Sequence, residues 1–405
     1  MRATGRPRDA TGRDRPVVAI FRSEFLPFSE TFIRDHLQGL RCYRPVAVAT
    51  HRVPGGLTVP AVPLHVLDEP ELGDRARNAL LRRRGLGETE IRRRHLARIL
   101  AGHRPAAVHA HFGPDGAFVR PAAKSAGVPL VVTFHGYDVS KHPESLLAAG
   151  GSAARMIRDW DRLVADTSAV VTVSQFLKQR LIDRGVDPKK IWVIPCGVDV
   201  ATFAKSEVPV DGPLVFVGRL VEKKGVSDLL EALAGLSDPP PLRVLGDGPL
   251  REDLRAQAER LGVRVSFEGA RTSAEVAAAI RGARFVVIPS KTTPDGETEG
   301  LPVVALEAQA SGRPVVASAH SGLTEAVVDG ETGVLVPEGD VAALGRAISA
   351  LAGDPDRLRR YGDRGHAHVA AHFSTAHTLS ELEALYDTIA PDGSVRTRPA
   401  QEQTR

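Results

Sequence analysis

The stretch Ser290–Ala317, SKTTPDGETEGLPVVALEAQASGRPVVA, indicates both the fold and the place of the functional site. It follows the apolar run at residues 284–288, which has the length of a buried strand. A Gly-rich loop comes next, and then a helix that we expect to begin at Pro302, because proline is tolerated in the first turn of a helix. A second apolar run, at residues 314–317, ends the stretch. Strand, loop, helix and strand are the parts of one βα unit.

The same alternation of short apolar runs and amphipathic stretches recurs along the chain and divides into two sets. The first set of predicted strands lies at residues 16–21, 44–50, 107–111, 129–134, 169–173 and 191–194. The second set lies at residues 213–217, 242–245, 263–267, 284–288 and 314–317. Helices are expected between the strands, for example at residues 29–40 with Ser29 as the N-cap. The pattern predicts an α/β fold with two Rossmann-like parallel-sheet domains that face a cleft, followed by C-terminal helices at residues 341–389.

The domain boundaries follow from changes in composition along the chain. We expect a disordered N-terminus at residues 1–15, an N-terminal Rossmann-like domain at 16–203 and a polar linker at 204–212. A C-terminal Rossmann-like domain at 213–373 follows. Residues 374–390 are predicted to form a helix that packs back on the N-terminal domain, and residues 391–405 a disordered tail.

Composition excludes several classes of protein. The chain has 405 residues, 42% of them hydrophobic, which is enough for two domains with their own cores. Cys42 and Cys196 lie far apart without zinc-ligand spacing, so we expect a reducing compartment. No apolar run approaches the roughly 20 residues of a membrane-spanning helix, and the Arg-rich N-terminus has no signal-peptide core. The sequence therefore predicts a cytoplasmic protein.

Ligands of parallel sheets bind in the loops beyond the carboxyl ends of the strands. Residues 218–225, GRLVEKKG, form such a loop before a predicted helix. Arg219, Lys224 and the free N–H groups of a helix N-terminus suit a phosphate, although a solvated turn is the alternative. Residues 246–250, GDGPL, match only half of a dinucleotide-binding glycine pattern, which is more typical of a tight turn.

Two glutamates in the opening stretch are candidate ligand-binding residues. Glu299 lies in the Gly-rich loop, and Glu307 follows eight residues later in the helix. Carboxylates beside free N–H groups at residues 300–304 suit a polyhydroxylated ligand that bears a phosphate. Carboxylates in a first turn are also common helix caps, so the spacing leaves both interpretations open.

Histidines follow the predicted strands of the N-terminal half. His109 and His111 lie on one face of a strand, but we expect no third metal ligand near them. His135 and Gly136 end the strand at residues 129–134, which points His135 into the cleft. A structural histidine bound to a loop is the alternative.

The order of these motifs resembles retaining glycosyltransferase family 4, which has the GT-B fold. The resemblance covers residues 17–390 and rests on the segments Gly218-Arg219 with Lys224-Gly225, Gly246-Asp247-Gly248-Pro249, Glu268-Gly269, Glu299-Gly300-Leu301-Pro302 with Glu307-Ala308, residues 312–317 and residues 194–199. The segments Ser29-Glu30-Thr31-Phe32-Ile33 and residues 134–140 are similar to the exopolysaccharide and colanic-acid branch of that family.

The resemblance implies an enzyme that transfers a hexose-type sugar from a nucleoside-diphosphate sugar to a glycan or lipid-linked glycan in polysaccharide biosynthesis. Transfer would retain the anomeric configuration and use neither a metal nor another cofactor. The implied catalytic residues are His135, Arg219, Lys224 and Glu299. The implied donor-binding residues are Gly218, Arg219, Lys224, Gly246, Gly248, Glu268, Gly300, Leu301, Pro302, Val303 and Glu307. Ser29, Glu30, Thr31, Tyr137 and Asp138 would lie on the acceptor side.

The resemblance also implies a separate role for each residue of the donor site. Arg219 and Lys224 would hold the diphosphate, Glu307 the ribose, and Glu299 the transferred sugar together with the backbone of residues 300–303. His135 would contact that sugar from the other domain. The loop at residues 25–29 lacks the paired glycines of many relatives, so acceptor recognition transfers least well.

Two other functions remain open at this point. An NAD-dependent oxidoreductase needs a complete glycine fingerprint with an acidic residue about 20 positions later, and no strand supplies both. A catalytically silent sugar-nucleotide-binding or scaffold protein would share the fold. The DxD strings at residues 159–161 and 354–356 fall in helical or turn contexts, which argues against a metal site there.

The segment Arg75–Arg104 is strongly basic. It carries ten arginines against Asp74, Glu88 and Glu90, and leucines and isoleucines are interleaved with them. Amphipathic helices there would contact anionic lipid at the inner leaflet, unless the apolar side chains pack on the domain and the arginines face water. Nucleic acid is not an expected partner, because the segment has no aromatic residue for base stacking.

Overall fold

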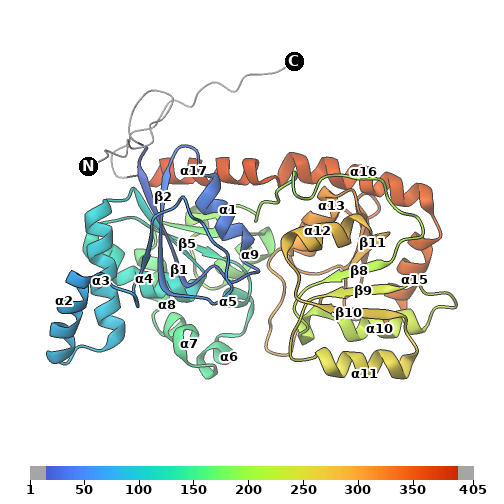
Figure 1. Ribbon diagram of the computed structural model, residues 1–405, viewed down its shortest axis with the longest axis horizontal. Coiled ribbons are helices and arrows are strands. Elements are labelled where there is room, and N and C mark those ends of the chain that lie inside the picture. The colour runs from blue at the N-terminus through green and yellow to red at the C-terminus, as the bar shows by residue number, and fades with distance from the viewer. Residues whose placement is uncertain (1–14, 391–405) are drawn as a thin grey trace, which may run out of the picture.

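The computed structural model describes residues 15–390, which form two parallel β-sheets with helices on both faces (Figure 1). The N-terminal sheet has seven strands in the order β3-β2-β1-β4-β5-β6-β7. Its strands are β1 (Val17–Phe25), β2 (Arg44–Arg52), β3 (Leu64–Val66), β4 (Ala107–His111), β5 (Leu130–Phe134), β6 (Ala169–Thr172) and β7 (Ile191–Val193). β1, β4, β5 and β6 are almost continuously buried, as expected for strands covered on both faces.

The C-terminal sheet has six strands in the order β10-β9-β8-β11-β12-β13. They are β8 (Leu214–Val217), β9 (Leu242–Leu245), β10 (Val265–Gly269), β11 (Phe285–Ile288), β12 (Val315–Ser318) and β13 (Gly333–Val336). In the first sheet, the chain adds β2 and β3 on one side of β1 and then continues with β4 on the other side. In the second sheet, β9 and β10 lie on one side of β8, and β11 follows on the other side, so the chain order reverses at β1 and at β8. Loops that leave such a reversal point diverge, which opens a crevice at the carboxyl ends of the strands.

Helices connect the strands in both domains. The N-terminal domain contains α1 (Thr31–Gly39), α2 (Leu72–Arg83), α3 (Glu88–His103), α4 (Gly113–Ala126), α5 (Tyr137–Ser140), α6 (Pro143–Ala148), α7 (Gly151–Arg158), α8 (Trp160–Asp166), α9 (Gln175–Asp183) and η1 (Pro188–Lys190). The C-terminal domain contains η2 (Glu222–Lys224), α10 (Val226–Ala234), α11 (Arg251–Leu261), α12 (Ser273–Arg281), α13 (Val303–Ala310), α14 (Leu323–Ala326), α15 (Val341–Ala352) and α16 (Pro355–His372).

The last helix, α17 (Thr375–Ile389), returns to the N-terminal domain, and Figure 1 shows α16 and α17 running across both domains. The backbone N–H of Thr375 donates to the carbonyl of Val198 (3.0 Å), which fixes the crossing. The carboxylate of Glu383 accepts the N–H groups of Arg41 and Cys42 (2.6 Å each). The apolar face of α17 shares one core with strands β1 and β2 and helix α1, to which it contributes Leu379, Leu382, Leu385 and Tyr386.

The predicted fold class is confirmed, and each of the eleven predicted strands is present within a few residues. The edge strands β3 and β13, of three and four residues, are additional. The expected N-cap Ser29 is wrong: Glu30 occupies that position, and its side chain bonds to Arg22 instead of capping the helix. The predicted tails at residues 1–14 and 391–405 lie outside the described residues.

None of the helices in residues 15–390 combines the length and the apolar character that a membrane span requires.

Candidate active site

A cavity of about 860 Å³ lies between the two domains, at the carboxyl ends of strands from both sheets. The C-terminal domain contributes its charged residues, from the loops that follow β8, β9, β10 and β11 and from α13. The N-terminal domain contributes mainly aromatic and hydroxyl side chains. The predicted site residues that line the cavity are Ser29, Thr31, His135, Gly218, Arg219, Lys224, Gly246, Glu299, Leu301, Pro302, Val303 and Glu307.

The loop between β8 and α10 supplies three cations to the cavity: Arg219, Lys223 and Lys224. Its backbone lies against the β9 loop, where Gly246 has a φ of +147°. A Cβ at Gly246 would come within 1.9 Å of the Gly218 carbonyl oxygen, so no side chain fits there. The close packing of these two glycine loops therefore fixes the cations in place.

Lys224 and Glu299 form an ion pair of 2.7 Å, and the Ser290 hydroxyl lies 3.2 Å from the same carboxylate. Burial alone would raise the pKa of Glu299, but Lys224 and Lys223 outweigh burial and lower it. Glu299 is thus an ionised acceptor at neutral pH. A bound phosphate would compete with this carboxylate for Lys224.

Glu297 is a residue that the sequence reasoning missed, and it links the two domains. Its carboxylate pairs with Lys223 (2.6 Å) and with Lys141 of the N-terminal domain (2.9 Å). Lys141 also pairs with Asp295 (2.8 Å). The sequence signals these pairs only through the many charged residues in the loop after β11. It does not show which of these residues pair with one another.

Glu307 lies on α13 and faces the cavity. Burial raises its pKa to about 7, and Asp35 of the other domain adds to the shift. The carboxyl group is therefore half protonated near neutral pH. A hydroxyl-bearing ligand would hydrogen-bond to it in either state.

The Gly-rich loop packs directly against the N-terminal domain. A Cβ at Gly300 would lie 2.0 Å from the carbonyl oxygen of His135 and 3.1 Å from Leu177, so glycine is required by this contact. Thr298 donates its N–H to the Ser140 hydroxyl (3.2 Å), which holds the same two loops together. The structure thereby brings His135 and Glu299, from different domains, into the lining of one cavity.

Six predicted site residues do not line the cavity: Glu30, Tyr137, Asp138, Gly248, Glu268 and Gly300. Asp138 is completely buried and accepts the N–H groups of Gly113 (2.9 Å) and Gly136 (3.0 Å), so it supports the loop that carries His135. The ring of Tyr137 lies against Phe112, with the ring centroids 5.8 Å apart and the planes inclined by 33°. Gly248 packs against the backbone of Leu220.

Charge pairs explain why two predicted glutamates lie away from the cavity. Glu268 is turned toward Arg243, 2.6 Å away. Glu30 is buried against Arg22 (2.7 Å), and Arg22 also binds Asp115 (3.0 Å). Arg22 and Asp115 were not identified from the sequence, because they lie 93 positions apart in the chain.

A third histidine lies beside His109 and His111, contrary to expectation: α1 brings in His36. Ring nitrogens of the three residues lie within 4.8 Å of one another. Both nitrogens of His109 are already engaged, with the Tyr386 hydroxyl (2.7 Å) and the Thr133 hydroxyl (2.6 Å), and its ring stacks on His111. A metal would have to break these bonds, so the geometry fits a packed column of neutral rings better than a metal centre.

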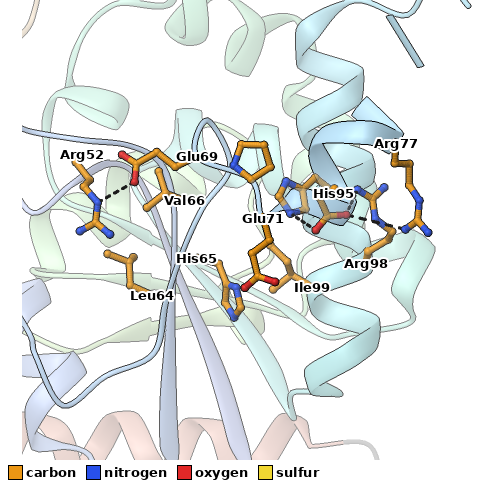
Figure 2. A pocket seen from close by; sticks show the side chains of 12 residues that line it. Arg52, Leu64, His65, Val66, Glu69, Glu71, Arg77, His95, Arg98 and Ile99 are labelled. Atoms are coloured by element: carbon orange, nitrogen blue, oxygen red, sulfur yellow. Dashed lines mark hydrogen bonds and ion pairs between the residues drawn. The ribbon is translucent and has the colours of Figure 1, made fainter. Parts of the chain in front are cut away.

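The basic segment is largely paired within the N-terminal domain. A cavity of about 380 Å³ lies beside it, and Figure 2 shows His95 and Arg98 among the residues that line it. Asp74 also lines this cavity and binds Arg98 (2.8 Å) and His95 (3.1 Å). On α3, Ile91, Leu96 and Leu100 are buried, so this helix follows the alternative in which the apolar side chains pack on the domain. Further arginine contacts are Arg75 with the Pro70 carbonyl, Arg77 with Asp74, Arg82 with Glu88, Arg92 with Asp68, Arg94 with Glu90, and Arg93 with the carbonyls of Ala117 and Phe118.

Two facing Rossmann-like domains, with a charged cavity where their sheets end, define a GT-B fold, which is the architecture of one class of glycosyltransferases. Family models agree with this class. The model of Glycosyltransferase Family 4 matches residues 30–202, and that of Glycosyl transferases group 1 matches residues 212–354. The chain belongs to glycosyltransferase family 4.

Similar proteins include WcaL of Salmonella typhimurium, which is assigned to colanic acid biosynthesis as a glycosyltransferase. It is 32% identical over 69% of this chain and 70% of its own length. A D-inositol 3-phosphate glycosyltransferase of Segniliparus rotundus is 34% identical over 71% of this chain and 67% of its own. The crystal structure of HepE from Anabaena in complex with UDP superposes with a TM-score of 0.73 at 20% identity, over 92% of this chain and all of that one.

Proposed function

We propose that the protein transfers a hexose-type sugar from a nucleoside-diphosphate sugar to a glycan or lipid-linked glycan in polysaccharide biosynthesis. The observation that carries the proposal is the ion pair between Lys224 and Glu299, with Arg219 and Lys223 beside it. It offers cations for a diphosphate and a carboxylate for a sugar in one cavity. The likeness to WcaL supports a polysaccharide product, and the UDP in HepE supports a nucleotide-sugar donor.

The proposed role of the cavity cations is to stabilise the charge that develops on the leaving diphosphate. When the bond between sugar and phosphate breaks, negative charge grows on the leaving diphosphate, and fixed cations in a cavity shielded from water stabilise that charge. Glu299 would accept hydroxyls of the transferred sugar, and Glu307 those of the ribose. His135 would close the other side of that sugar.

We propose that transfer retains the anomeric configuration and needs no divalent metal. Arg219, Lys223 and Lys224 line the cavity and would neutralise the diphosphate in place of a metal. The carboxylate nearest the reaction, Glu299, is tied to Lys224 and is a poor nucleophile. The leaving phosphate would then take the proton of the attacking acceptor hydroxyl on the same face of the sugar.

The test is hydrolysis of UDP-, GDP- and ADP-sugars by the purified chain without acceptor. We expect slow release of the nucleoside diphosphate from at least one donor, with undiminished rate in a chelator and a retained anomer by NMR. A catalytically silent protein would release none. Loss of activity in chelator with recovery in magnesium or manganese would contradict the metal-free reaction.

We further propose that α2 holds the enzyme at an anionic membrane surface. Leu72 is 81% exposed and Leu80 is 49% exposed, and both share this helix with the exposed Arg83. Arg84 follows directly, and neither Arg83 nor Arg84 pairs with an acidic group of the described residues. An apolar edge beside unpaired cations is the composition of an interfacial helix.

Replacing Arg83 and Arg84 by glutamine is expected to weaken binding to anionic vesicles about 30-fold at low salt, because each cation near such a surface contributes about 1 kcal/mol. The measurement is co-sedimentation with phosphatidylglycerol vesicles, and neutral vesicles give the baseline. Arg255 and Arg260, exposed on α11 of the other domain, are the matched control pair. Equal binding by both double variants would mean that α2 only faces water.

A further inference from the structure

We propose that the acceptor group seated against the N-terminal domain is an uncharged pyranose ring, which stacks its apolar face on a platform of Phe28, Phe32, Phe112 and His135. This inference rests on the proposed function and names the acceptor class. It separates the acceptor from phosphorylated or carboxylated sugars, whose charge the platform does not match.

The platform consists of ring side chains that line the cavity, with the rings of Phe32 and Phe112 inclined by 40° and 44° to that of His135. The ring of His135 lies between Phe32 (4.7 Å between centroids) and Phe112 (4.6 Å). Phe28 lines the same cavity and is 41% exposed, so its ring is open to a ligand. All four rings line the same cavity as the donor cations. The face of an aromatic ring carries partial negative charge and therefore attracts the C–H groups of a sugar.

Charge divides the cavity into two halves. Its cations, Arg219, Lys223, Lys224 and Arg271, all come from the C-terminal domain. On the N-terminal side, the described residues that line the cavity include neither lysine nor arginine, and neither aspartate nor glutamate. An anionic group on the acceptor would lose water there without gaining a partner, which is costly.

The nearest cation on that side is already neutralised. The Arg22 guanidinium lies over the ring of Phe112, 4.6 Å from its centre, and does not line the cavity. It is paired with Glu30 and Asp115, and the three groups together carry one negative charge. His135 adds no positive charge, since burial, together with His36 and Arg22, holds its pKa well below 6.5.

The backbone beside the platform is strained. Phe112 has a φ of +70° and Leu26, just before the loop that carries Phe28, has a φ of +49°. Side chains other than glycine rarely adopt this region, and it persists only where surrounding contacts hold it. Phe112 is held by its N–H bond to the Thr133 carbonyl (2.8 Å) and by the stacked Arg22. Such a position is typical of a surface shaped for a ligand.

Two hydroxyls border the rings and complete the site. Ser29 and Thr31 line the cavity next to Phe28 and Phe32 in the sequence. They can both donate to and accept from the hydroxyls at the edge of a sugar ring. Uncharged rings with uncharged hydroxyls at their border fit a pyranose, and they supply no positive charge to bind a phosphate.

The experiment measures transfer to soluble acceptors. The purified chain, with the donor that it hydrolyses, is offered octyl glycosides of neutral hexoses, the corresponding uronic acids and 6-phosphates, and D-inositol 3-phosphate. We expect neutral glycosides to accelerate release of the nucleoside diphosphate about 100-fold more than charged ones. A charged acceptor that is used as well as the neutral ones overturns the inference, and so does hydrolysis that no neutral glycoside accelerates.

Variants assign the effect to the platform. Phe28→Ala is expected to lower the ratio of transfer to hydrolysis about tenfold, and Phe28→Trp to restore it. Leu261→Ala, with 38% exposure on α11, is the control for loss of an exposed apolar side chain. Ser29→Lys adds a cation and should shift preference toward 6-phosphates. An unchanged ratio in Phe28→Ala refutes the platform, whereas absence of hydrolysis with every donor refutes the proposed function itself.

Discussion

Replacing Lys224 by alanine is expected to lower turnover of the donor about 10²- to 10³-fold. The side chain lies in the cavity and is the cation closest to Glu299, at 2.7 Å. Its charge is fixed before reaction, so the enzyme needs no rearrangement to stabilise the leaving diphosphate. Affinity for the nucleoside diphosphate should fall together with turnover, and calorimetry measures it directly. Unchanged affinity would remove Lys224 from the diphosphate site.

The same substitution is expected to destabilise the fold, because it leaves the buried Glu299 carboxylate without its partner. Breaking a buried ion pair in this way costs about 3–5 kcal/mol. The double variant Lys224→Ala with Glu299→Gln should recover much of the stability and none of the activity. Lys291 pairs with Asp228 (3.0 Å) outside the cavity and provides the matched control, since Lys291→Ala should keep turnover near the wild-type value.

Replacing Glu307 by glutamine is expected to weaken nucleoside-diphosphate binding about tenfold or more at pH 8, where the native carboxylate is ionised and, in the proposed role, would accept two ribose hydroxyls. Glu299→Gln should instead reduce mainly the additional affinity that the sugar provides. Calorimetry with a nucleoside diphosphate and with its sugar conjugate separates the two roles. Equal losses for both ligands in both variants would contradict the division between ribose and sugar.

Glu307 also predicts a pH dependence of stability. Its pKa is raised to about 7 in the folded protein, so the folded state binds the proton more tightly than the unfolded state does. Proton binding by Glu307 therefore stabilises the folded state. This contribution to the free energy of unfolding is complete below about pH 4.5 and is lost as the pH rises through 7. Glu307→Gln removes this loss. The variant should therefore gain as much as about 3 kcal/mol relative to wild type between pH 5 and pH 8, measured by urea unfolding.

The backbone of this protein follows from its sequence more fully than its side-chain pairs do. Apolar runs and glycines predicted the strands and the loops that hold Arg219, Lys224 and Glu299, because short-range sequence patterns determine strands and loops. The sequence analysis assigned a role to Lys224 but none to its neighbour Lys223. Two adjacent lysines cannot be distinguished from the sequence, because the partner of Lys223, Glu297, is known only from the structure.

Long-range partners account for most of what the sequence left open. Arg22 was not identified because its partner Asp115 meets it only after β1 and β4 are paired. Asp138 looked like an acceptor-side residue because it follows His135 closely, yet the helical turn that begins at Tyr137 directs it inward. The third histidine, His36, reaches its neighbours only through the packing of α1.

The return of α17 to the first domain has a consequence for synthesis. The strands of that domain leave the ribosome early, but the core they share with Leu382 and Tyr386 is incomplete until residues 375–389 have been translated. His109 meanwhile lacks the Tyr386 hydroxyl that it contacts at 2.7 Å in the finished protein. The domain that is made first is therefore completed last, and nascent chains stalled before α17 should be open to proteases and chaperones along the exposed face of β1 and α1.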